Sequence, residues 1–182
     1  MRFAVEMLTR GVDFPRYRRV YFSEPFNRCV VSEANLLERT LLACESLEDG
    51  RERRRMRVVP RLELPKLLVP LLQGHAVHYE EVSLFDPSTR SAELEVHTIA
   101  GDRLRVGARV EFIEQSDGVR ACFDCHAEVR VFGLASIVER HLAQEVTQRY
   151  ALVERALQRF FDEGREHEIT GSAGFEPVVR SS

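Results

Sequence analysis

The stretch that decides the fold is RLRVGARVEFIEQSDGVRACFDCHAEVRVF, residues 103–132. Apolar residues alternate with charged or small ones through its first half, and the alternation resumes after a Ser-Asp-Gly turn. A strand with one buried face has this period of two, because successive side chains point to opposite faces. The stretch therefore predicts two long antiparallel strands joined as a hairpin. The inward face of this hairpin is expected to carry Leu104, Val106, Ala108, Val110, Phe112, Val119, Ala121, Phe123, Cys125, Ala127, Val129 and Val131.

Shorter alternating segments around this hairpin predict further strands. HAVHYEEVSLF (75–85) and AELEVHTIA (92–100) come before it and are separated by the turn DPSTRS. NLLERTLLACESLE (35–48) and RERRRMRVVPRLE (51–63) flank the turn at Gly50 and predict another hairpin, and MRFAVEML (1–8) fits a first strand. The chain is therefore expected to form about seven strands, of which the last six follow one another.

Two regions have helical signals. PRYRRVYFSEPFNRCVV (15–31) follows Asp13, a suitable N-cap, and Pro25 is expected to divide it into two short helices. From Leu134 to Phe161 apolar residues recur every three or four positions, which predicts one long amphipathic helix. LELPKLLVPLLQG (62–74) predicts a short apolar helix or an ordered loop. Residues 163–182 lack periodicity and are expected to form a flexible tail behind a domain of residues 1–162.

The order of these elements predicts an α+β fold with the sequence β-α-α-β6-α. A sheet that is apolar on one face must cover that face with another layer, and only the C-terminal helix is long enough to do so. We therefore expect a curved antiparallel sheet of about seven strands that grips the long C-terminal helix.

In this order of elements the chain resembles the START-like superfamily, also called helix-grip or SRPBCC proteins, over residues 1–161. LPKLLVPLLQG, HYEEVSLFD, GARVEF and VRVFGLASIVERHL are similar to an uncharacterised bacterial family of START-like proteins, and the best matching positions are Gly133, Ile137, Val138 and Glu139. A weaker likeness exists to the eukaryotic VASt lipid-transfer domains. The resemblance implies an elongated cavity between sheet and helix for an apolar molecule, used in this superfamily by transfer proteins, sensors, cyclases and hydrolases.

Composition describes an ordinary globular protein of 182 residues, 44% hydrophobic and 30% charged, with a net charge of −3. This balance lacks the cation excess that nucleic-acid binding needs, so no nucleic-acid partner is expected. No segment has the length and apolarity of a signal peptide or a membrane span. We therefore expect a cytoplasmic protein whose four cysteines are reduced.

The first functional hypothesis is that the protein binds a hydrophobic small molecule or lipid, for transfer or sensing, without catalysis. Alternating large and small residues on the inward face could leave a cavity, and a filled core is the alternative. The residues expected to line the cavity are Val77, Tyr79, Leu94, Val96, Ala108, Val110, Phe112, Ala121, Phe123, Cys125, Ala127, Ile137, Val138 and Leu142.

The second hypothesis is a START-like enzyme of cyclase or hydrolase type. It needs titratable groups inside the cavity, and the candidates are Tyr79, Glu81 and His141, with Glu145 one helical turn after the histidine. No cofactor is expected. No metal site is expected either, since His75 and His78 lie three residues apart on a strand and so point to opposite faces, which disfavours a metal pair. A third possibility is an interaction module that holds no ligand.

A transient membrane contact is a further expectation. The basic run of residues 51–57, from Arg51 to Arg57, could touch an anionic surface, and the leucine-rich segment from Leu64 to Leu72 could contact lipid. The alternative is a solvated strand whose charges prevent association between sheet edges. The sequence gives no indication of the oligomeric state.

CFDCH, residues 122–126, has the C-x-x-C-H pattern of covalent haem attachment, and its two cysteines also suggest a redox pair or half a zinc site. On a strand, however, Cys122 and Cys125 point to opposite faces, because their numbers differ by three. They are then unable to hold one metal ion or to form a disulfide without breaking the hairpin. We therefore interpret the motif as coincidence, with Cys125 directed inward and Cys122 toward solvent.

Overall fold

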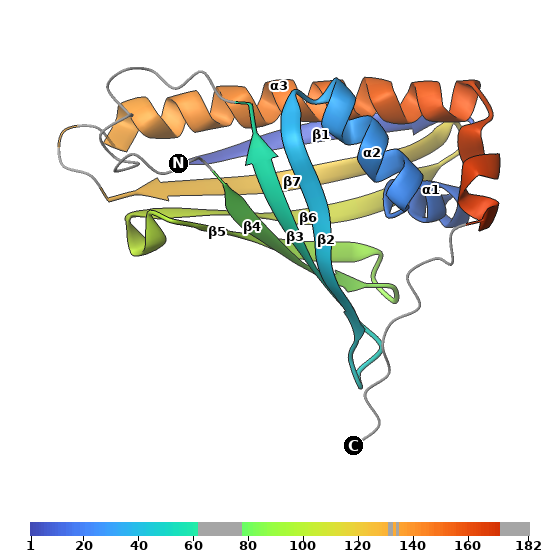
Figure 1. Ribbon diagram of the computed structural model, residues 1–182, viewed down its shortest axis with the longest axis horizontal. Helices are drawn as coiled ribbons and strands as arrows, with labels where there is room; N and C mark the ends of the chain where they lie inside the picture. The colour runs from blue at the N-terminus through green and yellow to red at the C-terminus, as the bar shows by residue number, and fades with distance from the viewer. Residues whose placement is uncertain (62–77, 131–132, 134, 172–182) are drawn as a thin grey trace.

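A single curved antiparallel sheet wraps one side of a long helix in the computed structural model, which describes residues 1–61, 78–130, 133 and 135–171 (Figure 1). Its seven strands follow the order β1-β7-β6-β5-β4-β3-β2. Their bounds are Arg2–Arg10 (β1), Leu36–Ser46 (β2), Glu52–Pro60 (β3), Tyr79–Asp86 (β4), Ser91–Thr98 (β5), Leu104–Gln115 (β6) and Gly118–Val129 (β7). The expected α+β fold, with its order of elements, is confirmed.

β6 and β7 form the predicted hairpin, with Gln115 opposite Gly118 and Val110 opposite Phe123. Gly118 has a φ of +149°, and a Cβ atom there would lie 2.0 Å from the carbonyl oxygen of Thr9 on β1. A side chain at this position would therefore collide with the neighbouring strand. The hairpin turn and the pairing of β1 with β7 both depend on this glycine.

Two short helices connect β1 to β2, as the position of Pro25 predicted. Helix α1 (Phe14–Tyr21) begins at Asp13, whose carboxylate accepts a hydrogen bond from the backbone N–H of Arg16 at 2.9 Å. Helix α2 (Glu24–Glu33) begins at Ser23, whose hydroxyl accepts from the backbone N–H of Phe26 at 3.2 Å. Pro25 lies in the first turn of α2, where a missing N–H has no cost.

Helix α3 (Ala135–Asp162) is the predicted long helix and runs along the length of the molecule (Figure 1). Side chains near its C-terminal end bind the free edge of β1: the backbone N–H groups of Leu8 and Arg10 donate to Glu154 and Gln158, each at 2.7 Å. Near its first turn, Glu139 accepts from the backbone N–H of Val129 on β7 at 3.1 Å. These bonds fix α3 along the edge formed by β1 and β7.

An aromatic cluster fills the space between α1, α2, the sheet and the C-terminal end of α3. Tyr17 packs on Phe112 with ring centroids 5.7 Å apart, and Phe85 packs on Phe112 at 6.1 Å. Phe26 of α2 meets Phe160 of α3 edge to face at 5.8 Å. All five rings are at most 5% exposed, so this end of the interior is solid.

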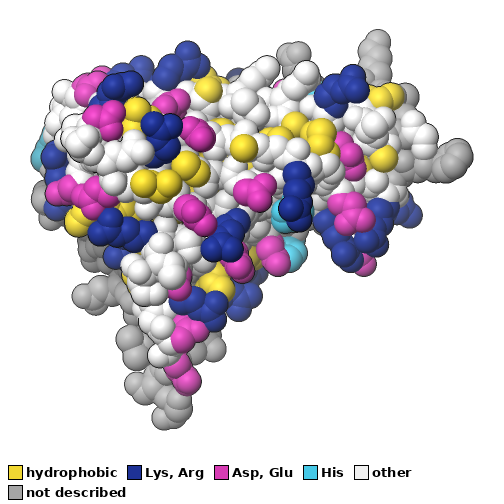
Figure 2. Space-filling view, turned by 180° about the vertical axis from the view of Figure 1, so that it is seen from behind, with side chains coloured by type: hydrophobic (Ala, Val, Ile, Leu, Met, Phe, Trp, Pro, Cys, Tyr) yellow, Lys and Arg dark blue, Asp and Glu magenta, His cyan; other side chains and the backbone are white. Residues whose placement is uncertain are grey.

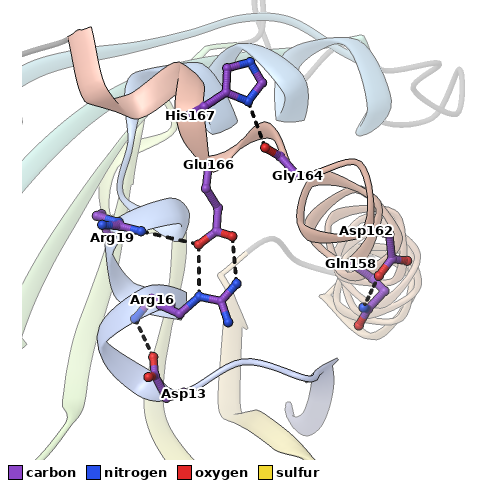
Figure 3. A network of polar contacts seen from close by, with 8 residues as sticks. All are labelled: Asp13, Arg16, Arg19, Gln158, Asp162, Gly164, Glu166 and His167. Carbon is purple, nitrogen blue, oxygen red and sulfur yellow. Dashed lines mark hydrogen bonds and ion pairs between the residues drawn. The ribbon is translucent and has the colours of Figure 1, made fainter.

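Two 3-10 helices complete the described structure, η2 (Gly101–Arg103) between β5 and β6, and η3 (Arg165–Gly171) after α3. The carboxylate of Glu166 in η3 accepts two hydrogen bonds from Arg16 of α1, at 3.1 and 2.7 Å, and one from Arg19 at 3.4 Å (Figure 3). Part of the expected tail thus contacts α1. Residues 172–182 lie outside the described part, and the domain boundary at residue 162 stays a prediction.

Candidate functional site: a cavity between the sheet and α3

A cavity of about 580 Å³ lies between the concave face of the sheet and α3. Its floor is formed by two rows of laterally paired residues on neighbouring strands, each of which we call a rung. One rung joins Phe3, Cys125, Ala108 and Leu94, and the next joins Val106, Val96 and Glu81. The wall from α3 has an apolar stripe made of Val138, Leu142, Val146, Tyr150 and Val153.

The size of the side chains along each strand explains where the cavity begins. Val110 lies two residues after Ala108 on β6, toward the aromatic cluster. The rung through Val110 carries Phe85 and Phe123, which are 0% and 3% exposed. The rung through Ala108 carries only small or medium side chains in the middle of the sheet, so space remains above it. The boundary between the filled and the open part of the interior therefore lies between the rung with Phe85 and Phe123 and the rung with Ala108.

One side of the cavity carries polar groups. His141, Glu145 and Arg149 follow one another at one-turn intervals along α3, and all three line the cavity. Tyr79 and Glu81 line it from β4, where their spacing of two places both on the inward face. Arg39 of β2 joins them as a further lining residue.

The charged groups on this side form two loose ion pairs. Arg39 lies 3.6 Å from the carboxylate of Glu81, and it donates a shorter hydrogen bond of 2.8 Å to the side-chain oxygen of Asn27. Arg149 lies 3.9 Å from Glu145. Neither ion-pair distance is that of a normal hydrogen bond, so the carboxylates keep free acceptor capacity.

Three phenols line the same cavity and stay protonated at neutral pH. Burial raises the pKa of Tyr79, and Arg149 beside it lowers this pKa by a smaller amount. Burial also raises the pKa of Tyr21 to about 12 and that of Tyr150 well above its ordinary value. Each phenol is therefore a neutral group that can donate one hydrogen bond.

Most of the residues that the sequence predicted for the site come together here. The cavity is lined by Tyr79, Leu94, Val96, Ala108, Cys125, Val138 and Leu142 from the expected lining, and by Glu81 and His141 from the catalytic candidates. Val110, Phe112 and Phe123 adjoin instead a second space of about 40 Å³, which Glu81 and Leu94 also border.

Of the expected lining residues that the structure describes, three are brought to neither cavity. Ala121 and Ala127 are buried within packed parts of the sheet, at 0% and 1% exposure. Ile137 is 54% exposed, because it lies on the outer side of α3 while its neighbour Val138 faces inward. Val77 lies outside the described residues, as do the segment from Leu64 to Leu72 and His75.

Sequence reasoning missed Arg39, Arg149, Tyr21 and Tyr150 as lining residues. The spacing of Arg149, four residues after Glu145 and eight after His141, was a signal that could have found it. Arg39 gave no such signal, because register shifts between Leu36 and Glu38 and between Leu41 and Ala43 interrupt the alternation of β2.

The two cysteines of CFDCH have opposite orientations in β7. Cys125 is 3% exposed and lines the cavity, whereas Cys122 is partly exposed on the other face. All four cysteines are free thiols, and no cluster of metal-ligating side chains occurs within the described residues. A joint role of the two cysteines at one metal ion or haem is therefore incompatible with the strand geometry.

The outer surface has mixed charge. In the basic run Arg51 pairs with Asp49 at 2.6 Å, Arg55 with Glu80 at 2.8 Å, and Arg57 with Glu38 at 3.9 Å. Figure 2 shows basic and acidic side chains interspersed over the face turned away from the viewer of Figure 1. None of the helices in the described part of the chain has the length and apolarity to cross a membrane.

Comparison with known proteins adds a family and a fold. A family model described as "Protein of unknown function (DUF2505)" matches residues 9–160. No curated protein matches the chain. Among solved structures, TTHA0849 from Thermus thermophilus is similar with a TM-score of 0.59 and 13% identity, over 94% of this chain and all of that one.

Two further solved structures are an ARO/CYC protein and an aromatase/cyclase by their descriptions. The di-domain ARO/CYC StfQ from the steffimycin biosynthetic pathway has a TM-score of 0.58 and 10% identity, over 90% of this chain and 52% of StfQ. The Zhui aromatase/cyclase from Streptomyces sp. R1128 has a TM-score of 0.50 and 10% identity, over 96% of each chain. At these identities the likeness establishes the shared fold.

Proposed function

Since this chain belongs to the DUF2505 family and has the START-like, helix-grip fold, we propose that it binds an apolar small molecule between its sheet and α3. The observation that carries this proposal is the cavity of about 580 Å³, within the range of small-molecule sites. An empty apolar space of this size forfeits dispersion contacts on all its walls. A bound apolar molecule would restore those contacts, and transfer or sensing would follow from its release.

Binding without catalysis is the first candidate because the two ion pairs of the cavity hold their charged groups against one another. In each of these pairs the partner of the carboxylate is an arginine, whose guanidinium stays protonated and does not serve as a general acid or base near neutral pH. The cytoplasmic location is part of the same proposal, and four free thiols agree with a reducing compartment.

An enzyme of cyclase or hydrolase type is the second candidate, favoured by one specific observation. Tyr79 and Glu81 both line the cavity from one face of β4, where a protonated phenol could donate to a carbonyl oxygen and a carboxylate could accept a proton. StfQ is described as an ARO/CYC protein and Zhui as an aromatase/cyclase, which is consistent with this candidate.

A transient membrane contact through Arg51 to Arg57 and Leu64 to Leu72 is a separate proposal. Three of the arginines have acidic partners, so we expect at most a weak dependence on anionic lipid. Co-sedimentation with phosphatidylcholine vesicles, with and without phosphatidylserine, tests it. Equal sedimentation on both kinds of vesicle would remove the electrostatic part of the proposal.

The binding proposal is tested by mass spectrometry of the purified protein. Native spectra are expected to contain a mass above that of the chain, and organic extraction after denaturation is expected to release an apolar compound. The Ala108→Leu variant, with a smaller cavity, is the control and should retain less of it. A compound-free spectrum from several hosts, together with no uptake of added apolar dyes, would overturn the proposal.

A further inference from the structure

Polar side chains line the cavity from β2 and β4, and apolar side chains line it from β1, β6 and β7. Arg39, Tyr79 and Glu81 come from β2 and β4, on the side of the sheet away from β1. Phe3, Cys125 and Ala108 line the other side, from β1, β7 and β6. A molecule in the cavity therefore meets hydrogen-bonding groups along one edge and apolar side chains along the other.

Three of these polar groups have hydrogen-bonding capacity to spare. The Glu81 carboxylate has a cation at 3.6 Å and accepts no hydrogen bond from the described residues. Tyr79 has beside it the guanidinium of Arg149, which only donates, so the phenol hydrogen finds no acceptor there. The Nε2 atom of His141 is buried and has no hydrogen-bond partner in the described part of the chain.

A hydrocarbon ligand would leave these groups unsatisfied. A buried donor or acceptor without a partner loses the hydrogen bonds that water would give it, and a ligand oxygen would remove that cost. A fatty acyl chain offers no oxygen along its length. A molecule with several oxygens on one edge could bind Tyr79 and Glu81 at once and still bury its other edge against apolar side chains.

The charges of the lining favour a neutral ligand. Arg39 is balanced by Glu81, and Arg149 by Glu145. The remaining cation of the lining, Arg103, is exposed to solvent. An anionic head group inside the cavity would therefore find no unpaired cation among the described lining residues to compensate for its loss of water.

We propose that the ligand is a neutral, elongated molecule with hydroxyl or carbonyl oxygens along one edge, that Tyr79 and Glu81 on one face of β4 hydrogen-bond these oxygens, and that the buried Nε2 of His141 on α3 binds a further polar atom of the ligand. This inference rests on the proposed binding function and narrows its ligand class. It predicts a preference for a hydroxylated polycyclic compound over a free fatty acid or a plain hydrocarbon. In a cavity without polar side chains, all three compounds would bind about equally well.

Equilibrium dialysis with three probes at pH 7 tests the proposal. 1,8-Dihydroxyanthraquinone carries three oxygens on one edge, anthraquinone lacks the two hydroxyls, and palmitic acid offers an acyl chain with a charged head. The dihydroxy compound is expected to bind at least about tenfold more tightly than each of the other two.

Matched variants connect that preference to the named side chains. Tyr79→Phe and Glu81→Gln are each expected to reduce the preference for the dihydroxy compound several-fold, because anthraquinone lacks the two hydroxyls and loses less affinity in both variants. Tyr17→Phe removes a buried phenol oxygen outside the cavity, and Glu80→Gln removes a charge on the opposite face of β4, so both should keep the preference. Both also control for effects on folding.

The outcomes separate this inference from the function on which it rests. Equal affinity for dihydroxyanthraquinone and anthraquinone, or a preference for palmitate, would overturn the ligand class and leave binding itself intact. A preference that survives both Tyr79→Phe and Glu81→Gln would overturn the assignment of the polar edge. No binding of any of the three probes would count against the proposed function.

Discussion

The carboxylate of Glu154 on α3 accepts a hydrogen bond from the backbone N–H of Leu8 on β1, at 2.7 Å. Leu8 belongs to an edge strand of the sheet, whose outward N–H groups have no neighbouring strand. A helix side chain thus supplies the acceptor that a further strand would otherwise provide. The same contact anchors the helix whose other face closes the cavity.

Removing this acceptor should destabilise the protein. We expect Glu154→Ala to lower the free energy of unfolding by about 1–2 kcal/mol, because the N–H of Leu8 loses its partner in a half-buried position. Glu154→Gln keeps a carbonyl oxygen at the same place and should lose clearly less. Urea denaturation measures both, and an equal loss in the two variants would contradict the role of the hydrogen bond.

A larger side chain at position 108 should fill the cavity without damaging the fold. Ala108→Leu is expected to weaken the binding of the fluorescent probe 1-aminoanthracene at least about tenfold at unchanged or higher stability. Ala121→Leu is the matched control, since Ala121 is 0% exposed in a filled region and should lose about 1–3 kcal/mol. Similar losses of stability in both variants would mean that the space above Ala108 is filled.

Acid should weaken the contact between η3 and α1. The hydrogen bonds that Arg16 donates to Glu166, and the positive charge of Arg16, hold the pKa of Glu166 below its usual value. A depressed folded-state pKa gives stability that is complete above the unfolded pKa of about 4.3 and is lost as the pH falls through the folded pKa. Glu166→Gln should therefore cost about 0.5–1 kcal/mol at pH 7 and almost nothing at pH 2.

Urea denaturation at both pH values measures this difference. Glu48→Gln, an exposed change in the turn between β2 and β3, serves as the control for the loss of one surface carboxylate. A cost of Glu166→Gln that is the same at both pH values would show that the ion pair contributes nothing.

Cys125 should react slowly with alkylating reagents. Burial raises the pKa of its thiol to about 11, and the thiolate is the reactive form. Its modification by iodoacetamide should therefore accelerate about tenfold per pH unit between pH 8 and 10, and a bound apolar probe should protect it. Peptide mass spectrometry follows both cysteines, with the half-buried Cys122 as the internal control. Faster labelling of Cys125 than of Cys122, or no protection by the probe, would contradict its place in the cavity.

The fold was predictable because its signals are local. The alternation of residues 103–132 gave both strands of the central hairpin and the orientation of Cys122 and Cys125. Pro25 predicted the division between α1 and α2, and the spacing of apolar residues predicted α3. In each case the deciding interaction lies within a few residues along the chain.

For the cavity, the sequence predicted which side chains point inward but not where the interior is open. The sequence assigned Val110 and Phe112 to the same inward face as Ala108, and the assignment to that face is correct. Whether the space above each residue is open depends on α1, whose Tyr17 packs on Phe112. No such helix fills the space above Ala108, which lines the cavity in the described part of the chain.

Local patterns in the sequence were enough to predict the strands, the helices and the inward face of each strand, because backbone geometry ties these features to periods of two and 3.6 residues. The meeting of Arg39 of β2, Arg149 of α3 and Glu81 of β4 in one cavity, in contrast, depends on how the elements pack in three dimensions. Side chains 110 positions apart along the chain meet only when the curvature of the sheet and the position of α3 are fixed. Those two quantities result from packing throughout the core, which no local pattern encodes.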